Sequence, residues 1–232
     1  MPATIADQVR FVPASDQSLL IYFGDCISIE THERLRKFLR LLESQPISGV
    51  RNLHPAYCSA LLNFDALQIT HDELRRVLVQ RLAHIDNVPL PEPRHIKIPT
   101  CYGSVFGPDL SDLARLHELT PDQVIELHSS ATYVVYFLGF VPGFAYLGGL
   151  PAAIATPRLA TPRRITPPGS VGIADDQTGV YPFDTPGGWR IIGRTPVSMF
   201  RPDRPDMSFL AIGDRVRFTP ISAEKFAAMK TA

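Results

Sequence analysis

The chain has 232 residues, 45% of them hydrophobic, and its 23 lysines and arginines balance 23 aspartates and glutamates. This length can bury one large core or two small ones, and we favour two domains. A formal net charge of zero gives no overall field that attracts nucleic acid or anionic lipid, so no nucleic-acid partner is expected. No basic and apolar leader opens the sequence, and no apolar run could cross a bilayer. We therefore expect a cytoplasmic protein without a membrane partner.

Cysteine usage argues against a metal centre. Cys26, Cys58 and Cys101 lie far apart and lack CxxC spacing, so neither a disulfide framework nor a zinc site is expected. Each lies in or next to an apolar run, where a thiol behaves as a small hydrophobic group. Core packing is favoured over a nucleophilic role, and no metal ligands are predicted.

The first 87 residues are predicted to form an α+β domain. In chain order the patterns predict two strands, a helix, two strands and a second helix, at residues 9–12, 19–23, 28–44, 49–53, 59–64 and 70–85. Thr70 and Glu73 have the spacing of a capping box at the start of the second helix. Residues 95–101 are available as a last strand. With that strand the order is a ferredoxin-like split βαβ unit plus an extra leading strand.

Residues 88–94 are predicted to be a linker, because alternate prolines favour an extended, semi-rigid chain. Residues 95–232 then form a second domain. It is predicted to hold strand 96–100, helices beginning at 108 and 121, strands 133–138, 170–173, 179–181, 189–194, 197–200 and 214–219, and a terminal helix or tail from 223. A closed or nearly closed β-barrel carrying two helices is the economical architecture.

Glycine, proline and aromatic residues crowd residues 126–196. Tight turns are predicted at 168–170 and 185–188, each before an apolar run. Such loops have shapes set by sequence, because glycine allows positive φ and proline fixes φ. Four aromatic residues of these loops are candidates for a pocket or a partner-facing patch: Phe140, Phe144, Tyr146 and Trp189.

A series of motifs in this half of the chain resembles a known family. The motifs are Tyr102-Gly103 with Gly107-Pro108-Asp109-Leu110, His128-Ser129-Ser130 with Tyr133, LGFVPGFAYLGGLP at 138–151, Pro157-Arg158, Pro162-Arg163, PPGSVGI at 167–173, QTGVYP at 177–182 and TPGGW at 185–189. The chain resembles subunit 1 of allophanate hydrolase, known in many bacteria as the B-type subunit of the ATP-dependent 5-oxoprolinase. One branch of that family is a sporulation histidine-kinase inhibitor. The chain departs from the family pattern at Ser104 and Phe106, which replace glycines and weaken any phosphate-cradling role for residues 103–107.

The resemblance implies a ferredoxin-like domain at 1–87 and a cyclophilin-like β-barrel domain at 95–232. It also implies one component of an amidohydrolase that is inactive alone. A companion subunit of the C type would help to bind and phosphorylate 5-oxoproline with ATP and Mg²⁺, and a subunit of the A type would complete ring opening to L-glutamate. Two alternatives stay open: a regulatory inhibitor of a histidine kinase, and a subunit of urea or allophanate metabolism.

The candidate site residues fall into three roles. The catalytic candidates are His128, as acid, base or ligand, and Arg158 and Arg163, as planar donors to phosphoryl oxygens. Alternatively, His128 caps a helix and the arginines pair with Asp175, Asp176 or Asp184. The substrate-binding candidates are Phe140, Phe144, Gln177, Thr178 and Tyr181, and the cofactor-binding candidates are Gly169, Ser170 and Gly172. A Walker-type site and a GxSxG hydrolase are not indicated, which favours a subunit that completes its site with another chain.

Overall fold

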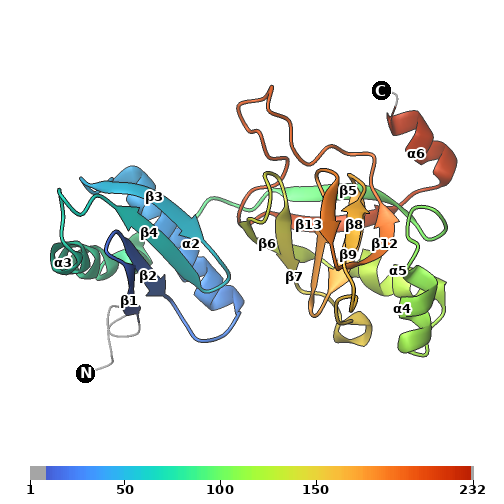
Figure 1. Ribbon diagram of the computed structural model, residues 1–232, viewed down its shortest axis with the longest axis horizontal. Helices are drawn as coiled ribbons and strands as arrows, with labels where there is room; N and C mark the ends of the chain where they lie inside the picture. Colours follow the sequence, from blue (N-terminus) through green and yellow to red (C-terminus); the bar gives the residue numbers. More distant parts are fainter. Residues whose placement is uncertain (1–8, 231–232) are drawn as a thin grey trace. The chain divides into compact units, whose positions relative to one another are not determined.

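The computed structural model describes residues 9–230, and the chain divides into two compact units between Glu92 and Pro93 (Figure 1). This division falls inside the proline-rich segment 88–94. Across residues 9–230, the helices are all too short or too polar to span a bilayer.

The first unit is built on a four-stranded antiparallel sheet in the order β1-β2-β4-β3. Its elements are β1 (Arg10–Ser15), β2 (Ser18–Tyr22), α2 (Ile29–Ser44), β3 (Val50–Pro55), β4 (Ser59–Phe64), α3 (His71–Leu82) and the 3-10 turn η1 (Ile85–Asn87). Strands β2 and β4 bury alternate residues, as period-2 sequences require. Their buried side chains form one core with those of both helices. The predicted capping box is confirmed, because the side chains of Thr70 and Glu73 each bond the other's backbone N–H.

The prediction that residues 95–101 could complete this sheet is wrong. The edge beside β2 is occupied by β1, which reaches it through a short hairpin. Strand β5 (His95–Tyr102) instead pairs with two strands of the second unit. Local hairpin closure costs little chain entropy, so the leading strand takes the position that a later strand would otherwise fill. The α+β class is confirmed, whereas the ferredoxin-like relation stays a prediction.

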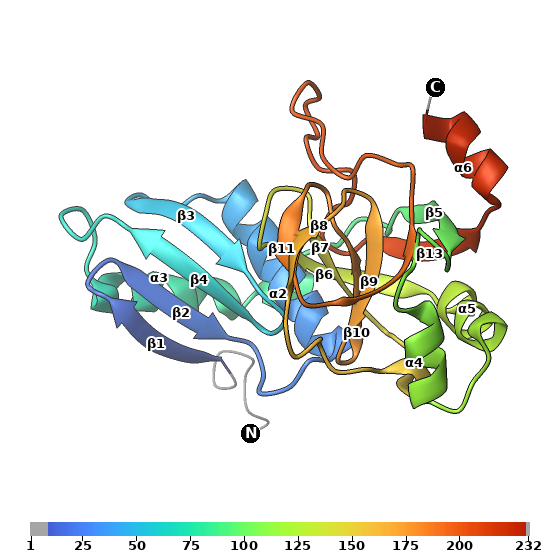
Figure 2. The same ribbon diagram turned by 45° about the vertical axis from the view of Figure 1, so that its right-hand side comes forward.

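Within residues 93–230, seven strands close into a barrel in the order β10-β7-β6-β13-β5-β12-β9, which confirms the predicted barrel. The strands beyond β5 are β6 (Tyr133–Leu138), β7 (Ala145–Gly148), β9 (Ser170–Ala174), β10 (Gln177–Val180), β12 (Arg190–Arg194) and β13 (Arg215–Pro220). A separate ladder pairs β8 (Arg163–Thr166) with β11 (Thr185–Gly187). Figure 2 labels both strands of this ladder. The cyclophilin-like relation stays a prediction.

Two helices pack on the barrel: α4 (Leu110–Leu116) and α5 (Pro121–Ser130). Helix α5 begins as predicted, with Thr120 as N-cap, Pro121 in its first turn and a capping box to Gln123. Buried apolar residues of both helices join the barrel core. A 3-10 turn η2 (Ala152–Ile154) and the terminal helix α6 (Ala223–Lys230) complete the unit.

Two local predictions in the second unit are wrong. Residues 197–200 form no strand, and only Phe200 makes an isolated bridge, to Ser208. Residues 185–187, predicted as a turn, form strand β11, because Thr185 finds a partner in Thr166. Strands β7, β8 and β11 went unpredicted, because each has only three or four residues and pairing with other strands decided its state.

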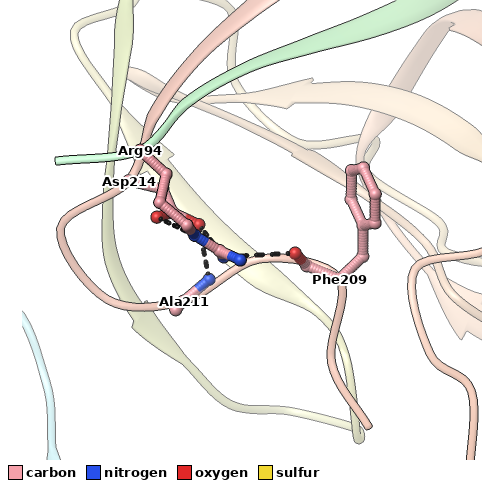
Figure 3. A network of polar contacts seen from close by, with 4 residues as sticks. All are labelled: Arg94, Phe209, Ala211 and Asp214. Carbon is pink, nitrogen blue, oxygen red and sulfur yellow. Dashed lines mark hydrogen bonds and ion pairs between the residues drawn. The ribbon is translucent and has the colours of Figure 1, made fainter. Parts of the chain in front are cut away.

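A polar network fastens the entry of the chain into the barrel (Figure 3). The Arg94 guanidinium donates to both carboxylate oxygens of Asp214, at 2.9 and 2.5 Å, and to the carbonyl of Phe209 at 3.3 Å. Asp214 is buried, and its carboxylate also accepts from the Ala211 N–H at 2.8 Å. The hydrogen bond to the Asp214 carboxylate raises the pKa of Arg94, because it stabilises the charged guanidinium. The network fixes the starts of β5 and β13 side by side.

Replacing Asp214 with alanine should lower the free energy of unfolding by about 2–3 kcal/mol. The change removes a buried partner of a half-exposed arginine and leaves the Ala211 N–H without its acceptor. Urea unfolding at neutral pH measures the effect. Asp203→Ala is the matched control, because Asp203 pairs with Arg201 on the surface and such pairs contribute about 0–1 kcal/mol. Equal effects of the two substitutions would contradict a special role for Asp214.

Candidate functional site

A cluster of aromatic side chains, separate from the barrel core, is formed by Phe144, Tyr181 and Trp189, which adjoin the ends of β7, β10 and β12. Phe144 is at its centre and meets Tyr146, Tyr181 and Trp189 edge to face, with ring centroids 5.0–5.3 Å away. Gly179 makes room for the rings, because a Cβ there would lie 3.1 Å from both Phe144 and Trp189. The aromatic cluster therefore depends on a glycine inside a paired strand.

Arg158 lies beside the aromatic cluster. Burial raises the pKa of Tyr181 to about 12, and the positive charges of Arg158 and Arg163 partly oppose that rise. Arg158 also opposes the rise that burial causes in the pKa of Tyr146. Its Nε is 3.7 Å from the Asp175 carboxylate, and both side chains are 59% exposed. Such an exposed pair contributes little, so the guanidinium can bind an anion at small cost.

Arg163 serves a different purpose, because its guanidinium is held inside the unit. One Nη donates to Asp109 Oδ1 at 2.5 Å and the other to the Trp189 carbonyl at 3.2 Å. Asp109 is buried, and its second oxygen accepts from the Ile191 N–H at 2.6 Å. This Asp109–Arg163 clamp ties β8 and the start of α4 to β12. The alternative expectation of an arginine–aspartate pair is met for Arg158 by Asp175, and for Arg163 by Asp109 rather than by Asp175, Asp176 or Asp184.

His128 is fully buried between α5 and the barrel, and both of its ring nitrogens are engaged. The Thr178 hydroxyl donates to the Gly172 carbonyl at 2.9 Å, so it accepts from His128 Nε2 at 3.0 Å. Nδ1 then accepts from the Tyr102 hydroxyl at 2.8 Å. Burial lowers the pKa of His128 to about 3. The ring is therefore a neutral interior link, with no open path to a substrate.

Comparison with known proteins identifies the family. The model of the carboxyltransferase domain, subdomain C and D, matches residues 9–210. The chain belongs to this family. It is 39% identical over 225 residues to the B-type subunit of 5-oxoprolinase from Bacillus subtilis, covering 93% of this chain and 94% of that protein. The resemblance carried by the sequence motifs is thereby confirmed.

Solved structures share the fold. The crystal structure of TTHA0988 is 33% identical with a TM-score of 0.79, and the match covers 89% of this chain. It covers 40% of TTHA0988, so this chain spans less than half of that polypeptide. The urea amidolyase of K. lactis, at 18% identity and a TM-score of 0.78, shares the fold over 98% of this chain and 16% of its own.

The predicted site residues of this carboxyltransferase-domain protein do not form one site. Arg158, Arg163, Phe144 and Tyr181 gather at the aromatic cluster, and Phe140 adjoins it through Phe144 at 5.6 Å. His128 and Thr178 form the interior link. Gln177 is half-buried at the start of β10. Because Phe144, Thr178 and Tyr181 are all buried, they support the wall of a site and do not present their side chains to a ligand.

The predicted cofactor turn has its donors already in use. The Gly169 N–H donates to the Tyr181 carbonyl at 2.7 Å, and the Ser170 N–H donates to the Pro167 carbonyl at 3.2 Å. Gly169 has φ +81°, and a Cβ there would lie 2.2 Å from the Thr195 carbonyl oxygen, so glycine is required by packing. Gly172 lies within β9, paired on both sides. These residues therefore do not fit a phosphate cradle in this structure.

Sequence reasoning missed two residues that organise this region, Asp109 and Tyr102. The sequence indicated only a helix start at Asp109, although its position in the Gly-Pro-Asp-Leu motif could have marked it. Tyr102 precedes Gly103 in another motif, but nothing local indicated that it reaches His128. Within residues 9–230, no group of three or more His, Cys, Asp or Glu side chains could hold a metal ion.

The interior histidine makes a pH-dependent contribution to stability. The pKa of about 3 in the folded state lies below the ordinary value of about 6.5, so the unfolded state binds more protons between these values. The contribution of the neutral ring to the free energy of unfolding is complete above pH 7 and is lost as the pH falls from there toward 3. We expect the advantage of wild type over His128→Gln to be about 2 kcal/mol smaller at pH 5 than at pH 7.5. Urea unfolding at both pH values measures it, and a constant difference would contradict a buried neutral ring.

Proposed function

We propose that this chain is the B-type subunit of an ATP-dependent 5-oxoprolinase, which opens the ring of 5-oxoproline to give L-glutamate. The observation that carries the proposal is the exposed Arg158 beside the aromatic cluster. Among its described residues, the barrel has no complete set of catalytic groups for hydrolysis. Relatedness to the B-type 5-oxoprolinase subunit of Bacillus subtilis supports the same function.

The substrate's chemistry suits Arg158. 5-Oxoproline carries a carboxylate, and activation of its lactam oxygen as a phosphate ester would add phosphoryl oxygens. A guanidinium binds both kinds of group through planar, charge-assisted hydrogen bonds. Arg158 is exposed enough to meet such an anion, whereas Arg163 is held by Asp109 and would act by positioning the β8–β11 ladder that carries it.

The missing chemistry is assigned to companion subunits. His128 has both nitrogens engaged, and the N–H groups of Gly169 and Ser170 donate within the protein. ATP and Mg²⁺ would therefore bind mainly through a C-type companion, and an A-type subunit would complete the ring opening. Arg158 and the aromatic cluster would form this chain's wall of the shared site.

A second candidate is a subunit of urea or allophanate metabolism, favoured by the fold shared with urea amidolyase. Both substrates are small amides, so they could suit the same aromatic wall. A substrate panel of 5-oxoproline, urea and allophanate, offered to the assembled complex, separates the two. The histidine-kinase inhibitor stays a prediction.

Arg158→Ala should lower kcat/KM for 5-oxoproline-dependent ATP hydrolysis by the assembled complex about 10- to 100-fold, through loss of a charge-assisted donor. The melting temperature should not change, because the Asp175 pair is exposed. Arg115→Ala is the control, since Arg115 is an arginine 80% exposed on α4. Steady-state kinetics of the reconstituted complex measure both variants.

The chain alone should show no ATP hydrolysis in response to 5-oxoproline. Turnover by the isolated chain would contradict a shared site. Equal activity of the Arg158→Ala and Arg115→Ala complexes would remove Arg158 from it.

A further inference from the structure

Phe140 is held in a strained backbone conformation. Its φ is +68°, and the Val141 N–H donates to the Gly139 carbonyl at 2.8 Å across it. A hydrogen bond between residues i and i+2 around a positive φ defines the rare and strained form of the γ-turn. For a bulky side chain, such a conformation costs about 1–3 kcal/mol. The surrounding loop must therefore enforce it.

The loop around Phe140 is fixed at both ends. The Gly139 N–H donates to the Phe144 carbonyl, and the Phe144 N–H donates to the Val141 carbonyl, each at 3.1 Å. Pro142 and Gly143, the latter with φ +82°, form the turn between them. A Cβ on Gly143 would lie 2.9 Å from the Met199 carbonyl oxygen, so the turn packs directly on the neighbouring chain segment. This loop is a rigid support for one side chain.

The side chain so supported is exposed. Phe140 keeps 59% of its accessible surface, although burial is what normally stabilises an aromatic ring. Its ring meets that of Phe144, with the two centroids 5.6 Å apart and the planes at 81° to each other. A strained backbone that holds an exposed phenylalanine does not stabilise the isolated chain. We therefore take the strain to indicate that the side chain contacts another molecule.

Exposed apolar side chains continue around this loop. Ser208 lines a shallow groove together with residues 138–143, and its neighbour Met207 is 51% exposed. Phe183, 38% exposed, meets Phe200 with ring centroids 5.5 Å apart, and Phe200 contacts the turn at Gly143. Phe140, Phe183 and Met207 together form the Phe140 patch.

We propose that the Phe140 ring is the anchor by which this chain docks into an apolar pocket of its C-type companion subunit. This inference rests on the proposed function. A ring that is 59% exposed on a rigid turn keeps most of its surface for a partner, and it can fill a concave site on a protein. A preorganised aromatic anchor also loses little entropy on binding. The match covers only 40% of TTHA0988, so in that protein the part similar to this chain is joined to further polypeptide.

The test compares Phe140→Gly with wild type in binding to the purified C-type subunit, measured by calorimetry. Glycine adopts positive φ without strain, so the variant should melt at the same temperature as wild type or higher. Its affinity should fall about 30-fold or more, the loss typical of a hot-spot aromatic residue. Leu67→Ala is the matched control, because Leu67 is a 97% exposed apolar residue of the first unit. That variant should bind within about twofold of wild type.

The outcomes separate the two proposals. If wild type binds the C-type subunit and Phe140→Gly binds equally well, the anchor is overturned while the proposed function stands. If wild type does not bind it, both proposals fail. If Phe140→Gly loses affinity but also melts lower, Phe140→Tyr decides: it keeps the ring, so restored affinity supports the anchor and continued loss overturns it.

Discussion

The second unit depends on the parallel pairing of β5 with β13, two strands that lie at opposite ends of its sequence. Every other neighbour in the barrel is antiparallel, so this one pairing converts an open sheet into a closed barrel. Long-range parallel pairing is slow to form and entropically costly, and the Arg94–Asp214 network offsets part of that cost where the two strands begin. Closure of the barrel is needed to form the core, to pack the two helices and to position the loops between the strands.

Buried and exposed polar groups of this unit serve different purposes. Inside, Tyr102, His128 and Thr178 form a satisfied chain of hydrogen bonds, which rigidifies the core and leaves nothing free to react. By contrast, Arg163 is clamped by the buried Asp109, whereas Arg158 stays exposed beside the aromatic cluster. Of these groups, Arg158 is the one available to a ligand.

Phe144 connects the two surfaces to which we assign functions. Its ring meets Phe140 on the strained loop and Tyr146, Tyr181 and Trp189 in the aromatic cluster. A companion protein seated on the Phe140 patch would therefore lie near Arg158. Such a companion would complete the shared site that we propose.

Elements that depend on neighbouring residues could be predicted from the sequence. Helical periodicity and capping residues located α2, α3 and α5, β-branched and aromatic runs located most barrel strands, and the proline-rich stretch marked where the chain divides. The pairing of strands became known only from the fold: β5 belongs to the barrel, residues 185–187 form a strand, and His128 is buried. Those outcomes depend on contacts between residues far apart in sequence, such as Tyr102 with His128 and Arg163 with Asp109, and no local pattern encodes them.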